Sequence, residues 1–149
     1  MKIIQLFLIL LSFSAFSQSN FEKAEKLYAQ KKYYDAEKVF KEHLKTQPNH
    51  AKTLEYLGDI AGHQKKWDEA IAAYTLCIAL DVEDPVPAFH MAECVAGKGD
   101  LADAQTLMAE VVQRCKAPEH QALKQKADAM LKLMALRAAR TAPSARVQP

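Results

Sequence analysis

The chain has 149 residues, of which 50% are hydrophobic and 26% are charged, and it contains only 4 glycines and 6 prolines. This composition excludes a disordered, collagen-like or low-complexity protein, and the length predicts a single domain. The 20 Lys and Arg residues nearly balance the 18 Asp and Glu residues, which leaves a formal net charge of +2. A protein that binds a phosphate backbone needs a larger positive excess, so nucleic acid is not an expected partner.

The first predicted element, residues 1–17, has the pattern of an export signal. Lys2 supplies a positive charge, residues 3–11 are almost entirely apolar, and Ala15-Phe16-Ser17 places small residues before a cleavage site. We predict cleavage after Ser17 and, because no second long apolar run follows, no stable membrane span in the mature chain. The alternative interpretation is a buried N-terminal helix, since large apolar side chains run all around this segment.

An internal repeat organises the rest of the chain. Four sets of residues recur at a spacing of 34 positions (from 36 to 70 to 104, for example), and the members of a set are similar in size. The small sets are Ala24, Gly58, Ala92 and Ala36, Ala70, Ala104, and the large sets are Tyr33, Trp67, Leu101 and Phe40, Tyr74, Met108. Apolar residues recur at helical spacing on two segments of each unit, separated by breaks at 30–32, 64–66 and 98–100. Each unit is therefore predicted to be a helical hairpin.

The middle unit resembles the tetratricopeptide repeat. It carries suitable residues at that family's signature positions: Leu54, Leu57, Gly58, Ala61, Trp67, Ala70, Tyr74 and Leu80. The resemblance implies an all-α, right-handed solenoid of three helix-turn-helix repeats, at about residues 17–50, 51–84 and 85–118. Small residues let the helices of a hairpin approach closely, while the large residues fill the space between hairpins.

A C-terminal helix is predicted to close the solenoid, because the last hairpin would otherwise expose an apolar face. Pro118 suits a helix start, and residues 119–139 are amphipathic. Their apolar stripe consists of Leu123, Ala127, Met130, Leu131 and Met134. The predicted tetratricopeptide domain thus spans residues 18–139, and the tail 140–149 is predicted to be disordered.

In tetratricopeptide proteins the first helix of each hairpin lines a concave groove, and the resemblance identifies the matching residues here. They are Phe21, Glu25, Tyr28, Glu55, Asp59, His63, Phe89 and Glu93. Aromatic rings can anchor an extended peptide, and carboxylates can attract its basic groups or accept its backbone hydrogen bonds. The predicted function is therefore a binding module for a protein or peptide client. The alternative is that these residues only form solvated helix faces.

Residues 74–135 resemble a narrower group, the class II chaperones of type III secretion, which hold translocator proteins before export. Three stretches carry the resemblance: Ala79 to Asp81 with Asp84-Pro85, Phe89 to Cys94, and Gly99 to Ala104. The resemblance implies a cytoplasmic chaperone that cradles an extended, proline-containing client segment, often as a homodimer.

The N-terminal half instead resembles exported tetratricopeptide proteins of bacterial envelopes. Together with the predicted signal, this resemblance implies a periplasmic or secreted location, and a scaffold that organises a cell-envelope complex is the alternative function. The composition also changes along the chain, since all four Arg residues follow residue 113. Two halves of different origin would still stack, because neighbouring hairpins contact only each other.

Candidates for catalysis or metal binding are few. His90, Glu93 and Cys94 share one helical face at a spacing that could serve a metal, but no fourth ligand accompanies them. The sequence contains no Gly-rich phosphate loop, Gly-x-Ser-x-Gly elbow or His-Glu-x-x-His motif. We therefore predict no catalytic residue, metal or cofactor, and no enzyme activity. A disulfide between Cys77 and Cys94 after export stays open, because the sequence does not fix their distance.

Overall fold

The computed structural model describes residues 20–141. The predicted export signal 1–17 lies outside the described residues, as do residues 142–149 of the predicted tail. Arg140 and Thr141, which we assigned to the tail from the sequence, form the end of the last helix instead. The two residues continue the last turn of the helix, and a sequence pattern defines the end of a helix only to within one or two residues.

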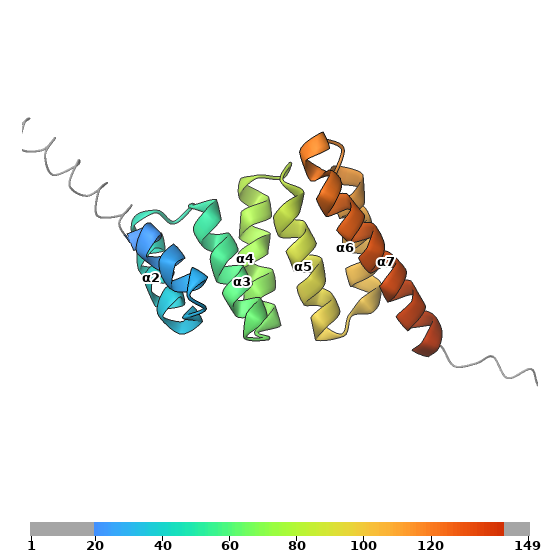
Figure 1. Ribbon diagram of the computed structural model, residues 1–149, viewed down its shortest axis with the longest axis horizontal. Coiled ribbons are helices and arrows are strands. Elements are labelled where there is room, and N and C mark those ends of the chain that lie inside the picture. Colours follow the sequence, from blue (N-terminus) through green and yellow to red (C-terminus); the bar gives the residue numbers. More distant parts are fainter. Residues whose placement is uncertain (1–19, 142–149) are drawn as a thin grey trace, which may run out of the picture.

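Every regular element of residues 20–141 is a helix (Figure 1). A first helix at residues 20–29, which we call the N-terminal helical segment, is followed by α2 (Tyr33–Thr46), α3 (Ala51–His63), α4 (Trp67–Leu80), α5 (Pro85–Lys98), α6 (Leu101–Arg114), the short 3-10 helix η1 (Pro118–His120) and α7 (Gln121–Thr141). From α2 onward each long helix packs against the next one, and the helices succeed one another along the longest axis of the molecule (Figure 1). The predicted all-α solenoid of three hairpins with a C-terminal capping helix is confirmed.

The residues that recur every 34 positions make up much of the core. Ala36, Ala70 and Ala104 are each fully buried. The large residues four positions later are buried as well: Phe40, Tyr74 and Met108 are 0%, 2% and 0% exposed. A small side chain on one helix leaves room for a large one nearby, so the same packing solution recurs in each hairpin.

The turn inside each hairpin contains a residue in the left-handed backbone conformation. Lys31 and Lys65 both have a φ of 59°, and Gly99, at the same place in the third repeat, has a φ of 110°. A left-handed residue lets the chain leave one helix and enter the next within a few residues. Glycine adopts this conformation without a steric penalty, whereas the two lysines adopt it against their intrinsic preference. The three breaks that the sequence indicates at 30–32, 64–66 and 98–100 are these turns.

The first helices of the second and third hairpins begin with side-chain caps of different chemistry. Asp84 accepts a hydrogen bond from the backbone N–H of Val86 (2.9 Å), and Pro85 is the first residue of α5. At the start of α3, Nδ1 of His50 accepts from the backbone N–H of Thr53 (3.2 Å). Burial lowers the pKa of His50 below its ordinary value of 6.5, and the neighbouring His43 lowers it further. The α3 cap therefore depends on a neutral imidazole.

We expect acid to weaken the α3 cap. The folded state holds a proton on His50 less readily than the unfolded state does, so this contribution to stability is complete above pH 6.5 and is lost as the pH falls through the lowered folded pKa. His50→Ala should reduce the free energy of unfolding by about 0.5–2 kcal/mol at neutral pH, and His50→Asn should keep the cap without titrating. Urea unfolding at about pH 8 and about pH 5.5 measures the difference. An equal acid-induced loss in the parent and in His50→Asn would contradict a titrating cap.

Candidate functional site

A cavity of about 430 Å³ lies where the first helices of the three hairpins meet α4. We call it the groove cavity. Its lining residues are Tyr28, Asp59, Gly62, His63, Trp67, Tyr74, His90, Glu93 and Cys94. Four of the residues predicted for the groove, namely Tyr28, Asp59, His63 and Glu93, therefore come together around one hollow, although they belong to three different helices.

The carboxylate of Asp59 is held at the centre of this site by two tyrosines. The hydroxyl of Tyr74 donates to Oδ1 (2.6 Å), and the hydroxyl of Tyr28 donates to Oδ2 (3.3 Å). Burial raises the pKa of both tyrosines well above the usual 10.0, and the adjacent Asp59 carboxylate raises it further. Both hydroxyls therefore remain protonated donors, and the position of the Asp59 carboxylate is fixed before any ligand arrives.

On α5, which also contributes to the lining, His90 and Glu93 form a pair one turn apart. Nδ1 of His90 lies 2.9 Å from Oε2 of Glu93, and the imidazole stacks on the ring of Tyr74 with 5.9 Å between centroids. The hydrogen bond to Glu93 raises the pKa of His90 above its ordinary 6.5, against the opposing effect of burial. The pair thus places a carboxylate and a titratable ring beside the fixed carboxylate of Asp59.

Three other residues predicted for the groove do not line this cavity and are engaged nearby. The Phe21 ring packs 5.9 Å from Phe40, centroid to centroid. Glu25 accepts a hydrogen bond from the hydroxyl of Tyr56 (3.0 Å), and Glu55 pairs with Lys52 (2.9 Å). Their part in ligand binding stays a prediction.

Phe89 occupies a different environment from the other predicted groove residues. Its side chain is only 5% exposed and belongs to the core cluster that joins α5 to α6, with Ala92 and Met108 among its members. Helical spacing places Phe89 on the same face as His90 and Glu93, but Phe89 is buried in a cluster with residues of α6 and α7. In the described structure Phe89 therefore holds two helices together and offers little surface to a ligand.

Sequence reasoning missed the contribution of α4 to the cavity. Trp67 and Tyr74 lie on the second helix of their hairpin, and their repeat positions predicted a packing role alone. The sequence feature that accompanies Trp67 is Gly97 in the next repeat. A Cβ atom at Gly97 would lie 3.0 Å from the Trp67 ring, so the glycine leaves space for the indole. Residues from second helices can thus reach the groove where the facing first helix carries a glycine.

The cysteines offer no activated nucleophile. Cys77, Cys94 and Cys115 are all buried and free. Burial raises the pKa of Cys77 and of Cys94 to about 11, so both are protonated thiols at neutral pH and react slowly. The cluster of His90, Glu93 and Cys94 does not form a metal site either, since no group of three His, Cys, Asp or Glu residues within 20–141 is arranged to hold an ion.

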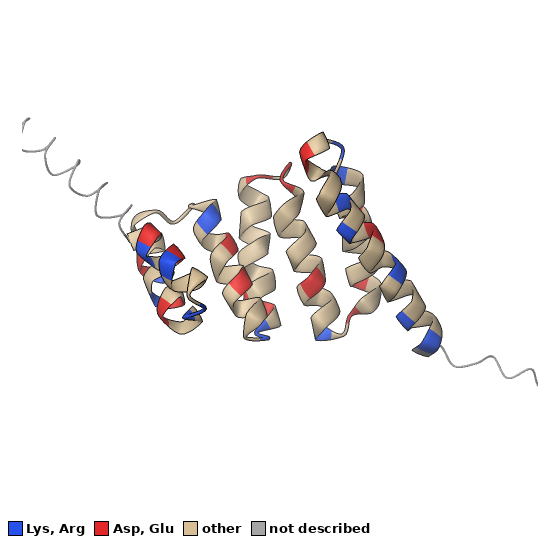
Figure 2. Cartoon of the chain, viewed as in Figure 1, with Lys and Arg blue, Asp and Glu red and all other residues tan. Residues whose placement is uncertain are grey.

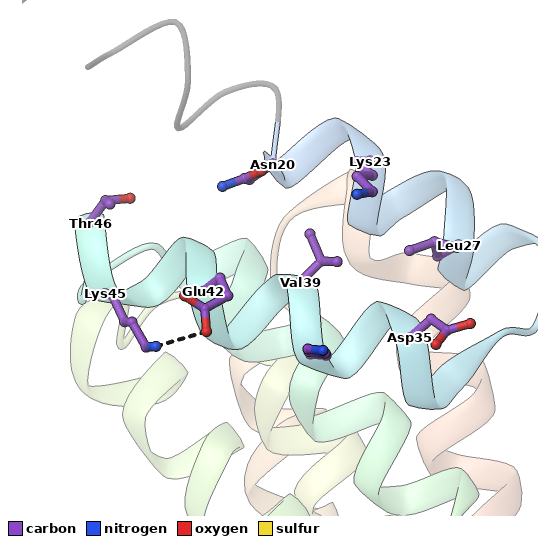
Figure 3. Close-up of a pocket in the computed structure, with 9 residues that line it drawn as sticks. Asn20, Lys23, Leu27, Asp35, Val39, Glu42, Lys45 and Thr46 are labelled. Atoms are coloured by element: carbon purple, nitrogen blue, oxygen red, sulfur yellow. Dashed lines mark hydrogen bonds and ion pairs between the residues drawn. The ribbon is translucent and has the colours of Figure 1, made fainter.

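A larger hollow of about 660 Å³ lies at the N-terminal end of the solenoid, between the N-terminal helical segment and α2 (Figure 3). Leu27 and Val39 contribute its apolar part, and charged residues, including an ion pair between Lys45 and Glu42 (2.7 Å), surround them. The segment residues that line it, Asn20, Lys23 and Leu27, differ from those that face the groove. This hollow is therefore a feature of the end of the solenoid and is separate from the groove cavity.

Charge is distributed unevenly over the helices. Acidic residues stand out on α3 and α5, whereas basic residues follow one another along α7 (Figure 2). Among the described helices, none is both long enough and apolar enough to cross a membrane. Asp59 of α3 and Glu93 of α5 are the two acidic residues among those that line the groove cavity.

These features define a helical solenoid of tetratricopeptide type with an acidic, aromatic hollow on its groove. Its neighbours among solved structures are translocator chaperones of type III secretion. SycD of Yersinia enterocolitica is 27% identical, with a TM-score of 0.78 over 85% of this chain and 88% of SycD. SycD has also been solved in complex with a peptide of the translocator YopD. PcrH, in complex with the chaperone-binding region of PopD, is 25% identical, with a TM-score of 0.78 over 84% of this chain and 95% of PcrH.

Sequence comparison leads to the same group of proteins. Low calcium response locus protein H of Yersinia pseudotuberculosis is 30% identical over 113 residues, which cover 74% of this chain and 66% of that protein. The chain thus spans just under two thirds of the length of this curated relative. No protein-family model matches the chain. The predicted resemblance to tetratricopeptide proteins and to translocator chaperones is confirmed by these similarities.

Proposed function

We propose that this chain is a non-catalytic, chaperone-like module that holds an extended segment of a translocator-type client in its concave groove. The observation that carries the proposal is the shared fold with SycD and PcrH, which have been solved with a peptide of YopD and with the chaperone-binding region of PopD. These comparisons favour a chaperone over the alternative of an envelope scaffold. A chaperone for type III secretion would act in the cytoplasm, which was the alternative location that the sequence left open.

The chemistry of the groove cavity suits an extended peptide. Such a segment presents unpaired backbone groups and regularly spaced side chains, and it is held by pockets together with fixed polar partners. The cavity supplies the rings of Tyr28 and Trp67 for contact and the carboxylates of Asp59 and Glu93 as acceptors. We propose these four residues, with His63, as the central contacts, and Phe21, Glu25 and Glu55 as an extension of the groove towards the N-terminal end. Phe89 supports the α5 side from within the core.

Filling the cavity tests this proposal. Gly62 lines the cavity, and a Cβ atom there would meet only Sγ of Cys94 at 3.6 Å, so Gly62→Phe adds a ring at the wall of the hollow from a Cβ position without close contacts. We expect this substitution to weaken the binding of fluorescently labelled peptides from the chaperone-binding region of PopD and from YopD by about tenfold or more. Fluorescence anisotropy measures the affinity, and circular dichroism reports helicity.

A matched control separates blocking from a general effect of added bulk. Ala79→Phe adds the same ring at an exposed position of α4 outside the cavity and should leave the affinity unchanged. If Gly62→Phe and Ala79→Phe bind the peptides equally well, the groove is not the client site. If neither peptide binds the parent protein, the proposed client class is wrong.

We also propose a homodimer as one state of the chain. SycD has been solved in an alternative dimer, and that structure matches this chain with a TM-score of 0.77 at 27% identity. Sedimentation equilibrium with and without the client peptide distinguishes a monomer from a dimer. This part of the proposal is independent of the groove, and its failure would leave peptide binding untouched.

A further inference from the structure

The geometry points to the groove cavity as a subsite for one basic side chain, lysine or arginine, of the bound peptide. This inference rests on the proposed peptide binding and adds the chemistry of one ligand position. A cationic side chain matches both the charge and the walls of the cavity, and no other class of side chain matches both.

The charge of the lining is the first argument. Two carboxylates, Asp59 from α3 and Glu93 from α5, face the cavity, and none of its described lining residues is a lysine or an arginine. The lysines of these two helices have ion-pair partners of their own: Lys52 pairs with Glu55 (2.9 Å), with a smaller contribution from the charge of Asp59, and Lys98 pairs with Asp68 (2.6 Å). Among the lining residues, His90 is the group that pairs with one of the two carboxylates, since its Nδ1 lies 2.9 Å from Oε2 of Glu93. A cation from the ligand would complete the balance.

The unused acceptor capacity of the carboxylates is the second argument. An ionised carboxylate offers about four lone-pair positions for hydrogen bonds. Asp59 accepts one bond from Tyr28 and one from Tyr74, and Glu93 has His90 as its partner. Acceptor positions therefore remain on both carboxylates, and an ammonium or guanidinium group can donate to them. An apolar side chain would instead remove water from the carboxylates without replacing its hydrogen bonds.

The aromatic walls are the third argument. The rings of Tyr28, Trp67 and Tyr74 line the same hollow as the two carboxylates. Aromatic faces attract cations, and the aliphatic stem of a lysine or arginine packs well against rings. A cavity of about 430 Å³ has room for such a long side chain. An acidic side chain would meet like charge, and a small polar one would leave the rings uncovered.

A pair of peptides that differ only in charge tests the inference. The probes are the blocked peptide Ac-Ala-Pro-Arg-Pro-Ala-NH2 and the same peptide with citrulline, which keeps the shape of arginine without its charge. Trp67 is the only tryptophan in the sequence and lines the cavity, so its fluorescence reports binding at this place. We expect the arginine peptide to bind about tenfold more tightly than the citrulline peptide, because hydrogen bonds between charged partners are the stronger ones.

Two variants and one control identify the residues responsible. Asp59→Asn and Glu93→Gln should each bring the two affinities to within about threefold of each other. Glu110→Gln removes the same charge from an exposed position on α6 and should preserve the preference. Circular dichroism checks folding. The side chain of Glu93 is 41% exposed, so Glu93→Gln should fold, and its effect on the arginine preference tests the inference even if Asp59→Asn does not fold.

The possible results separate this inference from the proposed function. Equal affinity for the two peptides, or no saturable change in Trp67 fluorescence with the arginine peptide, would overturn the inference. If the PopD and YopD peptides still bind in a manner blocked by Gly62→Phe, only the basic subsite is wrong. If the arginine preference is present but the translocator peptides do not bind, the subsite stands and the proposed client class is wrong.

Discussion

Phe40→Ala is expected to lower the free energy of unfolding by about 3–5 kcal/mol, the range for removing a buried phenylalanine. The side chain of Phe40 is fully buried on α2, where it stacks on Tyr56 of α3 with 4.9 Å between ring centroids. Two of its neighbours in this core cluster, Ala24 and Ala36, are small, so few atoms can move to fill the space that the ring leaves. Since small domains are stable by only about 5–15 kcal/mol, the substitution removes a large share of the total.

The loss should be concentrated at the N-terminal end of the solenoid. Each hairpin contacts mainly its neighbours, so a defect in one hairpin can open locally without opening the others. Hydrogen exchange should show reduced protection in residues 20–46 and nearly unchanged protection in α6. Tyr34→Ala, on the same helix but 80% exposed, should change stability by no more than about 0.5 kcal/mol. Similar exchange rates in α2 for the two variants would argue against a core role for Phe40.

The sequence predicted the fold well because each hairpin repeats the same packing of small and large residues. The small residues at 36, 70 and 104 and the large ones at 40, 74 and 108 are buried in all three hairpins, as the spacing of 34 indicated. Each hairpin packs on the next in the chain, so a periodic pattern contains most of the packing information. Even the residue with left-handed backbone conformation lies at the equivalent position of each hairpin. The residue type predicts this conformation at Gly99 but not at Lys31 and Lys65.

The site was less predictable because it depends on contacts between helices, made by residues that lie far apart in the sequence. Helical spacing placed Tyr28, Asp59 and Glu93 on groove-facing surfaces, and these residues do line the cavity. Spacing could not show that Phe89 is buried, because its burial depends on how α5 packs with α6 and α7. It also could not show that Tyr28 and Tyr74 donate to the same carboxylate, since these residues lie 31 and 15 positions from Asp59. Such pairing between helices is a property of the assembled solenoid.

Gly58→Ala is expected to destabilise the protein although alanine is the better helix former. A Cβ atom at position 58 would lie 2.7 Å from Cε1 and 2.8 Å from Cζ of Tyr74, closer than van der Waals contact allows. The Tyr74 ring is 2% exposed, and its hydroxyl donates to Asp59 at 2.6 Å, so the ring has little room to move and would strain or break that hydrogen bond. Overpacking of this kind destabilises by about 1–3 kcal/mol, against roughly 1 kcal/mol that alanine gains over glycine in a helix.

Gly62→Ala supplies the comparison for the clash, because Gly62 lies one helical turn further along α3 and the same substitution is made there within the helix. A Cβ atom there would meet only Sγ of Cys94, at an ordinary contact distance of 3.6 Å. The difference in the free energy of unfolding between the two variants, measured by urea denaturation, should therefore be about 1–3 kcal/mol in favour of Gly62→Ala. Gly58→Ala should also weaken peptide binding, since it displaces the tyrosine that orients Asp59, and Gly62→Ala should affect binding less. Equal stabilities for the two variants would show that the Tyr74 ring can move aside at no cost. The conclusion that Tyr74 fixes the position of the Asp59 carboxylate would then be wrong.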